Sequence, residues 1–418
     1  MQMEIYGWGK YPRVKAQVYK PKTIDELVNV VKNEPVILAR GMGKSYGDAS
    51  LFDKVISLKY INKIRKVTDT FIDVEAGCSL LKVLEAIVPY KKFLRVTPGI
   101  CGISIGGAIA SDVHGKNHFN SGSFYNIVSE ITVIDSKGDL IILEKEKHSA
   151  AFGDFFGSMG LKGIIVSAKI QLTELKGLML KEIIIPVENI DEFIDVFEEH
   201  LCCNFCVGWL NLAGKNAQLL VKAANWICEP NRDKVFIFKK QRYALFPFEF
   251  PVKIPKWAFN TFNRRYYAKA IKQPEKIVKM ENFFYPLDTI TNWNNVYGKN
   301  GLLQYHFNVN LTVAKEALSK AITMVLASNA VCTMAVIKRF GKRNIQTKYS
   351  FPDEGYNLAF DFVNNPTAVN LIADLDNLVE AYGGTIYKTK DAVSRLGVAI
   401  VSEGFQSLQN KRYIDDKQ

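Results

Sequence analysis

Two kinds of periodicity alternate along the first 175 residues. Apolar residues recur every three or four positions in Thr23–Val31, which begins with a capping box, and in Ser79–Ile87, so both segments are predicted to be amphipathic helices. Strands are predicted at Phe71–Ala76, where polar and apolar residues alternate, and at Ile164–Leu172. The turn sequence DSKGD joins two further apolar segments and is typical of a β-hairpin. This mixture predicts one α+β unit.

The character of the chain changes near Leu178, where a second series of apolar segments begins. We expect strands at Leu180–Pro186, Cys206–Leu212, Leu302–Val309, Met334–Phe340 and Tyr356–Phe362, and helices at Asp191–His200, Ala314–Ala327 and Pro366–Tyr382. These segments predict a second domain of antiparallel strands and helices.

One stretch of the second domain, residues 236–280, follows neither periodicity. Eleven Lys or Arg residues against two Glu lie between Lys239 and Lys279, interleaved with aromatic residues, and four prolines interrupt residues 247–274. Such a stretch predicts a long lid or surface excursion. A basic face with aromatic residues suits an anionic membrane surface at least as well as a merely soluble lid.

Composition limits the class of protein. With 418 residues, of which 48% are hydrophobic, the chain is long enough for two domains with full cores. No targeting pattern opens the chain and no apolar run approaches the length that spans a bilayer, so we expect a cytoplasmic protein. Seven scattered cysteines fit reduced thiols better than disulfides. The net charge of +12 indicates an acidic partner.

The most unusual stretch is Thr97–Asn126, which holds six glycines, a run of small residues and two histidines. Glycine lets the backbone adopt positive φ or lie directly against a flat ligand, at a cost in chain entropy. Polar and cationic residues from His114 to His118 end this strip, where they would meet an anionic or hydrogen-bonding ring. A large flat ligand explains the stretch, and a glycine-rich turn region is the simpler alternative.

A second glycine loop, Arg40–Asp48, follows a short predicted strand at Val36–Ala39. Successive N–H groups in such a loop form an anion-binding nest, for which a diphosphate is a natural ligand. The loop differs from the Rossmann fingerprint, because its third glycine comes one residue late and no amphipathic helix follows. Leu38 stands where a Walker A motif requires glycine. As a lone motif, the loop is equally typical of a turn.

Other candidate sites are weaker. His114 and His118 have the spacing of two metal ligands on one helical turn, but Gly115 argues against a helix and no carboxylate pair accompanies them, so no metal site is expected. His114 is better explained as a group that faces a cofactor. For Lys390, beside Asp391, a solvated lysine is the simplest interpretation. The basic stretch lacks the common nucleic-acid-binding signatures, so no nucleic acid partner is expected.

Five segments spread along nearly the whole chain carry a resemblance to a known family. They are Ala39–Ala49, Gly106–His118, Gly157–Gly163, Phe283–Tyr305 and Tyr387–Asp391. Together they resemble the FAD-dependent oxidases of the vanillyl-alcohol oxidase and p-cresol methylhydroxylase superfamily, and within it the decaprenylphosphoryl-ribose oxidase family. The resemblance implies a two-subdomain FAD-binding domain at 1–176 plus 386–418, with a substrate domain of antiparallel sheet and helices inserted at 177–385. The active site would lie between them.

The resemblance also implies roles for individual residues. The first loop would wrap the FAD diphosphate and the second would line the flavin. The implied cofactor-binding residues are Ala39, Arg40, Gly41, Met42, Gly43, Lys44, Ser45, Tyr46, Gly47, Asp48, Ala49, Gly99, Ser104, Ile105, Gly106, Gly107, Ser111, Asp112, Val113, His114, Ile164 and Tyr387. The implied substrate pocket is bordered by Lys116, Gln304, His306, Lys338, Asn357 and Lys390. Lys390, as a cation near flavin N1, and His114, as a positioning group, are the expected catalytic residues.

Three positions differ from the family pattern. In the wider superfamily a histidine of the first loop often carries the flavin covalently, and Lys44 stands at that position, so we expect noncovalent FAD. His306 stands where relatives have glutamine, and Ala359 where mycobacterial members have a cysteine beside the flavin. Both of these belong to the implied substrate pocket and bear on which sugar it accepts.

The reaction that the resemblance implies is oxidation of a sugar secondary alcohol. In the family this is the 2-hydroxyl of a polyprenyl-phosphate pentose, and a short-chain reductase partner returns the keto sugar with inverted configuration. A lipid-linked substrate implies peripheral attachment to an anionic membrane, such as the inner face of the plasma membrane. Two alternatives stay open: an aldonolactone or alditol oxidase of a soluble sugar, and a flavin-free basic protein that binds nucleic acid or membrane.

Overall fold

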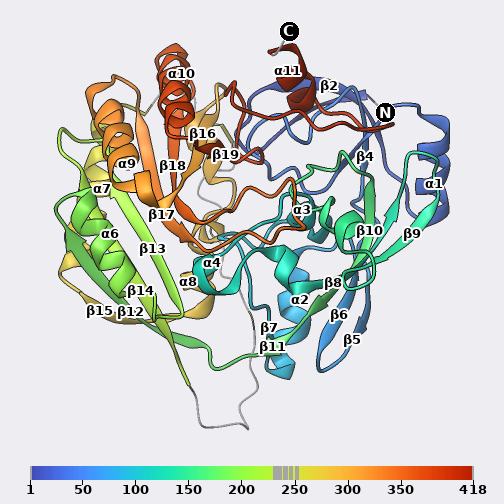
Figure 1. Ribbon diagram of the computed structural model, residues 1–418, viewed down its shortest axis with the longest axis horizontal. Coiled ribbons are helices and arrows are strands. Elements are labelled where there is room, and N and C mark those ends of the chain that lie inside the picture. Colours follow the sequence, from blue (N-terminus) through green and yellow to red (C-terminus); the bar gives the residue numbers. More distant parts are fainter. Residues whose placement is uncertain (1, 229–237, 239–242, 244–247, 250–253, 417–418) are drawn as a thin grey trace.

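The computed structural model describes residues 2–228, 238, 243, 248–249 and 254–416. One large sheet with its helices occupies the left of Figure 1, and three smaller sheets occupy the right. The mixture of helices with mainly antiparallel sheets confirms the α+β class. Among the described residues, no helix has the length and apolar content needed to cross a bilayer.

The smaller sheets are built from residues 2–174. A four-stranded mixed sheet has the order β1 (Gln2–Tyr6), β2 (Arg13–Tyr19), β4 (Lys54–Ser57), β3 (Leu38–Arg40). A five-stranded antiparallel sheet has the order β5 (Ile64–Val67), β6 (Phe71–Glu75), β10 (Ile164–Gln171), β8 (Val128–Ile134), β9 (Leu140–Glu144), and the two-residue strands β7 (Lys92–Phe93) and β11 (Thr173–Glu174) form a third pair. The predicted hairpin is therefore confirmed as β8 and β9.

Short helices accompany these sheets. They are α1 (Ile24–Asn33), α2 (Leu80–Ile87), α3 (Ile105–Ala110), α4 (His118–Ser121) and α5 (Ser149–Gly153), with 3₁₀ turns at Val88–Tyr90 and Phe124–Ile127. The first two confirm the predicted amphipathic helices. The Thr23 hydroxyl caps α1 by accepting a hydrogen bond from the Glu26 N–H at 3.2 Å, and Ser79 caps α2 in the same way.

The large sheet has eight strands, and every neighbouring pair is antiparallel. Their order is β15 (Glu275–Lys279), β12 (Met179–Val187), β14 (Gln218–Ile227), β13 (Phe205–Asn211), β17 (Cys332–Phe340), β18 (Gly355–Val363), β16 (Leu302–Val309), β19 (Thr385–Ile386). Each predicted strand of this region lies within one of these, to within two residues at either end.

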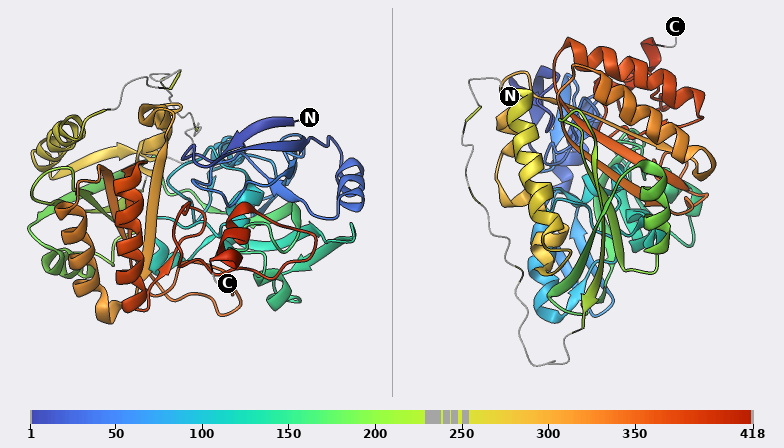
Figure 2. Two further views of the ribbon diagram at one scale, coloured as in Figure 1. Left: turned by 90° about the horizontal axis from the view of Figure 1, so that it is seen from above. Right: turned by 90° about the vertical axis from the view of Figure 1, so that its left-hand side faces the viewer.

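One face of the large sheet is covered by α6 (Ile190–Glu199), α9 (Leu311–Ala327) and α10 (Pro366–Ala381), which lie at one end of the molecule in Figure 2. Phe193, Leu318 and Leu375 of these helices pack with Phe307 and Phe360 of the strands, and all five are fully buried. Because side chains alternate along a strand, the opposite face of each strand is left for other partners.

The stretch at residues 236–280, predicted as a lid or surface excursion without periodicity, contains regular elements where the structure describes it. Residues 256–271 form the helix α7, and residues 275–279 form β15, the edge strand of the large sheet. Ala270 packs with Ile184 and Leu220, which lie on the face of the sheet opposite α9 and α10 (Figure 2). The remainder of the predicted lid lies mostly outside the described residues.

The remaining elements join the two parts. They are α8 (Met280–Phe284), 3₁₀ turns at Pro286–Thr289 and Trp293–Tyr297, and the last helix, α11 (Leu408–Asp415). In the described part of the chain, the face of the large sheet that α6, α9 and α10 leave free lies opposite the loops that follow β3 and β7 (Figure 1).

Candidate active site

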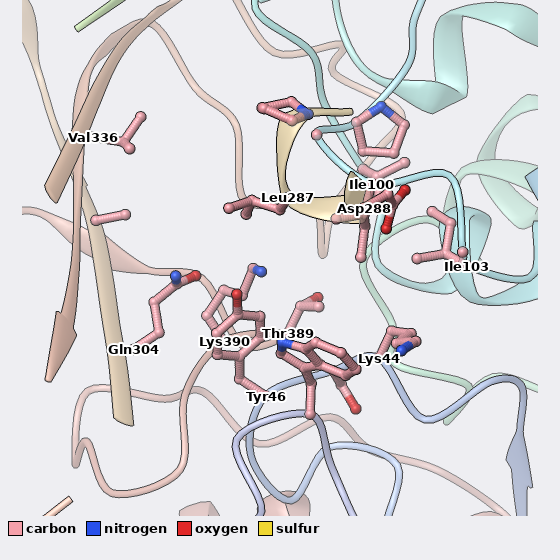
Figure 3. Close-up of a pocket in the computed structure, with 18 of the residues that line it drawn as sticks. Lys44, Tyr46, Ile100, Ile103, Leu287, Asp288, Gln304, Val336, Thr389 and Lys390 are labelled. Atoms are coloured by element: carbon pink, nitrogen blue, oxygen red, sulfur yellow. The ribbon is translucent and has the colours of Figure 1, made fainter. Parts of the chain in front are cut away.

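A cavity of about 1460 Å³ lies between the two glycine loops and the face of the large sheet that is turned away from α9 and α10. Single ligand pockets occupy about 300 to 1,000 Å³, so this cavity has room for more than one ligand. Figure 3 shows Gln304 and Val336 of the sheet on one side, Ile103 and Asp288 on the other, and Lys390 and Tyr46 between them.

The first glycine loop follows β3, where Arg40 points beneath it. The Arg40 guanidinium donates to the backbone oxygens of Ser50 at 3.0 Å and Tyr6 at 2.6 Å. Gly43 has φ of +62°, and a Cβ added there would lie 2.2 Å from this guanidinium, so the turn requires glycine. The loop is therefore held from below by Arg40 and presents its backbone to the cavity.

The second glycine stretch folds into α3 and the loops beside it. The Ser104 hydroxyl caps this short helix and accepts from the Gly107 N–H at 3.3 Å. At Gly106 an added Cβ would lie 2.9 Å from the Cβ of Ala76, whereas at Gly99 it would meet no atom within 4 Å. Gly106 thus lets α3 pack closely on β6, and Gly99 borders open space in the cavity.

His114 lies at the end of this stretch, buried among other rings. Its ring centroid is 4.7 Å from that of Phe340, 5.3 Å from Tyr387 and 5.9 Å from His306. Burial, and then the nearby Lys338, hold the pKa of His114 well below its ordinary value, so the imidazole is neutral. Its Nδ1 is buried without a hydrogen-bond partner among the described residues, which leaves it available to a ligand.

The opposite wall consists of polar side chains at alternate positions of three neighbouring strands. In register, Gln304 faces Asp361, His306 faces Ala359, and Lys338 faces Asn357. His306 Nε2 lies 2.8 Å from the side-chain oxygen of Asn357. The intervening residues on the same strands point into the core beneath α9 and α10. The polar rows therefore face the glycine loops across the cavity.

Lys390 enters the cavity from the segment after β19. Its Nζ lies 3.7 Å from the centre of the Tyr46 ring, within the range of a cation–π contact. Burial lowers the pKa of Lys390 and raises that of Asp361, and each charge favours the charged form of the other. Asp361 accepts a hydrogen bond from Gln304 through one oxygen, while its other oxygen is buried without a partner among the described residues.

Side chains of α11 connect the first glycine loop to the segment that carries Lys390. The Arg412 guanidinium lies 3.2 Å from the carboxylate of Asp48 and 2.7 Å from that of Asp391. Tyr413 donates to Asp391 at 2.5 Å. An arginine shared by two buried carboxylates fixes both segments relative to each other. Asp48 therefore supports the first loop from outside the cavity lining.

Most of the residues assigned from the resemblance meet in the cavity. Its lining includes Ala39, Gly41, Met42, Gly43, Lys44, Ser45, Tyr46, Ala49, Gly99, Ser104, Gly106, Gly107, Ser111, Val113, His114, Tyr387 and all six substrate residues, Lys116, Gln304, His306, Lys338, Asn357 and Lys390. Six assigned residues lie behind it, namely Arg40, Gly47, Asp48, Ile105, Asp112 and Ile164. Asp112, for example, is fully buried and accepts hydrogen bonds from the Tyr125 N–H and the Ser350 hydroxyl.

The sequence reasoning missed several polar and aromatic lining residues, including Asp361, Lys222, Tyr266 and Trp209. For Asp361 a signal exists, because it stands in FDFV, where a carboxylate at an alternate strand position is flanked by two core phenylalanines. Tyr266 had no such signal. Its helix buries only Asn263 and Ala270, so α7 lacks the apolar stripe by which helices are recognised.

Comparison with known proteins gives this geometry a context. Residues 15–144 match the model of an FAD binding domain family. A decaprenylphosphoryl-beta-D-ribose oxidase from Mycolicibacterium smegmatis is 29% identical over 410 residues, which cover 93% of this chain and 88% of the relative. D-arabinono-1,4-lactone oxidases from Candida glabrata and Saccharomyces cerevisiae are each 25% identical, over 42% and 44% of this chain and 35% and 36% of their own lengths.

The cavity fits an FAD on its own evidence. A strip of glycine and small residues borders open space at Gly99, where a flat ring system can approach the backbone. The first loop adds a backbone-lined cradle for a diphosphate, and the buried Nδ1 of His114 lacks a partner at the end of the strip. The lysine and amide rows of the large sheet then have room for a second, polar ligand.

Proposed function

We propose that the chain is an FAD-dependent oxidase that converts the 2-hydroxyl of a polyprenyl-phosphate pentose to a ketone, on the basis of its FAD binding domain match and its similarity to a decaprenylphosphoryl-beta-D-ribose oxidase. The observation that carries the proposal is the cavity itself. Its glycine-rich wall suits a flavin, and its sheet wall offers amide, imidazole and ammonium groups to a polyhydroxylated ligand.

We assign the two walls to two domains. Residues 1–176 and 386–418 form a two-subdomain FAD-binding domain of the p-cresol methylhydroxylase type, and residues 177–385 form an inserted substrate domain. Support comes from the family match within residues 15–144 and from the large sheet, seven of whose eight strands lie wholly within residues 179–363.

Bound FAD supplies a hydride acceptor for the carbinol carbon. The protein's own residues bind and orient the sugar and stabilise charge. Lys390 brings an ammonium group into the cavity, where its charge stabilises an anion that develops nearby. His114, being neutral, holds a hydrogen bond through the unpaired Nδ1 and so orients the ligand that lies against it.

The sugar specificity rests on the rows of the large sheet. His306 and Ala359 face each other in register, and both line the cavity. The imidazole provides one hydrogen-bonding group at this row, and the small alanine leaves space beside it. A ketone left by the oxidation keeps the sugar's other centres, so a short-chain reductase partner that returns it with inverted configuration completes an epimerisation.

FAD is held without a covalent bond in this proposal. Lys44 occupies the loop position where a tethering histidine would stand, and its Nζ lies 3.5 Å from the centre of the Trp8 ring. Acid precipitation of the purified protein is expected to release all the flavin into the supernatant. Yellow colour that persists in the washed pellet would contradict this expectation.

A second candidate function is oxidation of a soluble aldonolactone or alditol. The D-arabinono-1,4-lactone oxidases among the relatives favour it. The two functions separate in one experiment, namely anaerobic bleaching of the flavin by a substrate panel. Rapid bleaching by a polyprenyl-phosphate pentose, and slow or no bleaching by free sugars and lactones, is the expected result. The reverse order of rates would replace the proposal with the lactone or alditol oxidase.

Access to a lipid-linked substrate requires a membrane-facing entrance. On α7, Trp257 and Phe262 are about 70% exposed, and Arg264, Arg265 and Lys269 are exposed beside them. Aromatic and basic side chains in this combination bind anionic lipid surfaces. We therefore assign α7 as the contact of a peripheral protein with the inner face of the plasma membrane.

A further inference from the structure

Three lysines from different elements meet in the part of the cavity beneath α7. Lys116 precedes α4, Lys222 belongs to β14 and Lys338 to β17, and all three line the cavity. The backbone oxygen of Lys116 accepts a hydrogen bond of 3.0 Å from the N–H of Cys206 on β13, the strand that lies between β14 and β17. Because Lys222 faces Val207 of β13 in register, and Lys116 is bonded to the neighbouring Cys206, the fold brings these lysines to adjacent positions of the cavity wall.

The immediate partners of two of these lysines are neutral. Lys222 donates to the Tyr266 hydroxyl, and its Nζ lies 4.6 Å from the centre of that ring. Lys116 donates to the backbone oxygen of Phe283 and lies 4.0 Å from the centre of the Phe283 ring. These contacts orient the ammonium groups, but they do not neutralise their charge.

The nearby carboxylates do not balance the cluster. Glu182 also lines this part of the cavity, but it forms an ion pair of 2.9 Å with Lys276. Of the other lining carboxylates, Asp361 interacts with Lys390, and Asp288 accepts from the Cys101 N–H at 2.5 Å. Among the described residues that line this part of the cavity, lysines therefore outnumber carboxylates, an arrangement that favours a bound anion.

An apolar wall adjoins the cluster. Side chains of α7 and its neighbours line the same cavity, namely Trp209, Ile254, Ala258, Phe259, Phe262 and Tyr266. The rings of Trp209 and Tyr266 are 4.8 Å apart, so the Tyr266 side chain touches both the basic cluster and the apolar wall. The ligand that fits both features has an anionic group joined to an apolar chain.

We propose that Lys116, Lys222 and Lys338 bind the phosphate of the substrate, and that its apolar chain leaves the cavity along the aromatic side of α7. This inference rests on the proposed function and extends it to a subsite. The sugar then lies on the rows of Gln304, His306 and Asn357, toward the glycine loops. Lysine suits this role because it binds phosphate as a compact point charge.

The test measures binding without catalysis. Farnesyl phosphate, farnesol and inorganic phosphate are titrated into the FAD-loaded protein at low salt, with calorimetry as the readout. Farnesyl phosphate is expected to bind at least about tenfold more tightly than either other probe, since only it fills both the basic cluster and the apolar wall. Equal affinity for farnesyl phosphate and farnesol would overturn the proposal, and equal affinity for farnesyl phosphate and free phosphate would remove the apolar path.

Variants locate the subsite. Lys222→Gln and Lys338→Gln are each expected to weaken farnesyl phosphate binding by about tenfold or more and to leave farnesol binding unchanged. Lys222→Arg keeps the charge and is expected to retain most of the affinity. Lys181→Gln is the matched control, because Lys181 forms an exposed ion pair with Glu275 outside the cavity. Unchanged farnesyl phosphate affinity in both Gln variants would place the phosphate elsewhere.

Failure of this inference and failure of the proposed function give different results. Flavin bleaching by a sugar that lacks phosphate, as fast as by the phosphorylated sugar, would remove the phosphate subsite and leave sugar oxidation standing. Tight binding of farnesyl phosphate that depends on Lys222, together with no bleaching by any polyprenyl-phosphate pentose, would keep the subsite and remove the proposed substrate.

Discussion

The two walls of the cavity are built on opposite principles. The wall formed by residues 39–49 and 97–115 presents mainly backbone and small side chains, and its glycines either permit a turn, as at Gly43, or leave open space, as at Gly99. The wall formed by the large sheet presents long polar side chains at alternate strand positions. One wall recognises a ligand by shape and the other by charge and hydrogen bonds.

The two walls therefore respond to different kinds of substitution. A large flat cofactor needs close approach of the backbone, so substitutions on the first wall act through volume. A sugar phosphate needs matching polar groups, so substitutions on the second wall act through charge. Lys390 belongs to neither wall by sequence, because it follows β19, yet it faces both from the bottom of the cavity.

The largest expected effect comes from filling the glycine wall. In Gly99→Trp the new side chain points into open cavity, so the protein is expected to fold and to be purified without flavin, with FAD affinity reduced by more than about a hundredfold. Gly99→Ala adds only a Cβ that meets no atom within 4 Å, and it is expected to keep the flavin. Absorbance at the flavin bands and circular dichroism measure the two properties separately. A yellow Gly99→Trp protein would mean that the flavin lies elsewhere.

The second-largest expected effect comes from removing the charge of Lys390, which lies between the two walls. Lys390→Ala is expected to keep measurable FAD binding and to slow flavin reduction by on the order of a hundredfold or more, the usual cost of removing a group that stabilises developing charge. Lys388→Ala is the matched control from the same segment, because Lys388 does not line the cavity. Stopped-flow bleaching measures both. Reduction at the parental rate in the Lys390 variant would return Lys390 to the simplest interpretation of its sequence, a lysine without a catalytic role.

Features that depend on local sequence patterns could be predicted from the sequence, and features that depend on distant contacts could not. The hairpin of β8 and β9 and the cap of α1 depend on local patterns, and the structure confirms both. The glycine wall is recognisable because glycine runs are rare. Lys222 on β14 and the helix α7 were missed, because their apolar partners form no periodic core pattern beside the cavity. Asp48 was assigned to the cofactor, since the sequence does not reveal that Arg412 meets it from α11.

The charge of the lysine cluster, Lys116, Lys222 and Lys338, is expected to depend on pH. Burial lowers the pKa of Lys116 to about 7, with Lys222 and Lys338 acting in the same direction, and burial lowers the pKa of Lys338 to about 8. The charged and titratable groups that face this cluster also include Glu182, Lys276 and Tyr266. Ammonium groups lose their charge as pH rises through the pKa, while a phosphate monoester is already mostly dianionic above about pH 6.

Affinity for farnesyl phosphate is therefore expected to be greatest near pH 6 to 7 and to fall by about tenfold toward pH 9, whereas affinity for farnesol stays constant. Calorimetric titration at each pH measures the two profiles. In Lys338→Gln the decline above pH 8 is expected to be smaller, because one of the titrating groups is gone. A farnesyl phosphate profile as flat as that of farnesol would show that neutral contacts, rather than the lysines, hold the ligand.

The smallest expected effect concerns the exposed basic residues of α7 and their attraction to an anionic membrane. Each Lys or Arg near an anionic bilayer contributes about 1 kcal/mol, and salt weakens this attraction. A variant with Arg264, Arg265, Lys269 and Lys272 changed to Ser is expected to lose most of its sedimentation with anionic vesicles, while the parent loses it only as salt is raised.

All four of the substituted side chains are exposed, so the fold and the cavity are expected to be unchanged. The matched control changes four exposed lysines in the region of the smaller sheets to Ser, namely Lys59, Lys63, Lys66 and Lys137. Equal sedimentation of the α7 variant and the parent, or equal sedimentation of the parent with neutral and anionic vesicles, would show that α7 only covers the cavity, and would favour a soluble substrate.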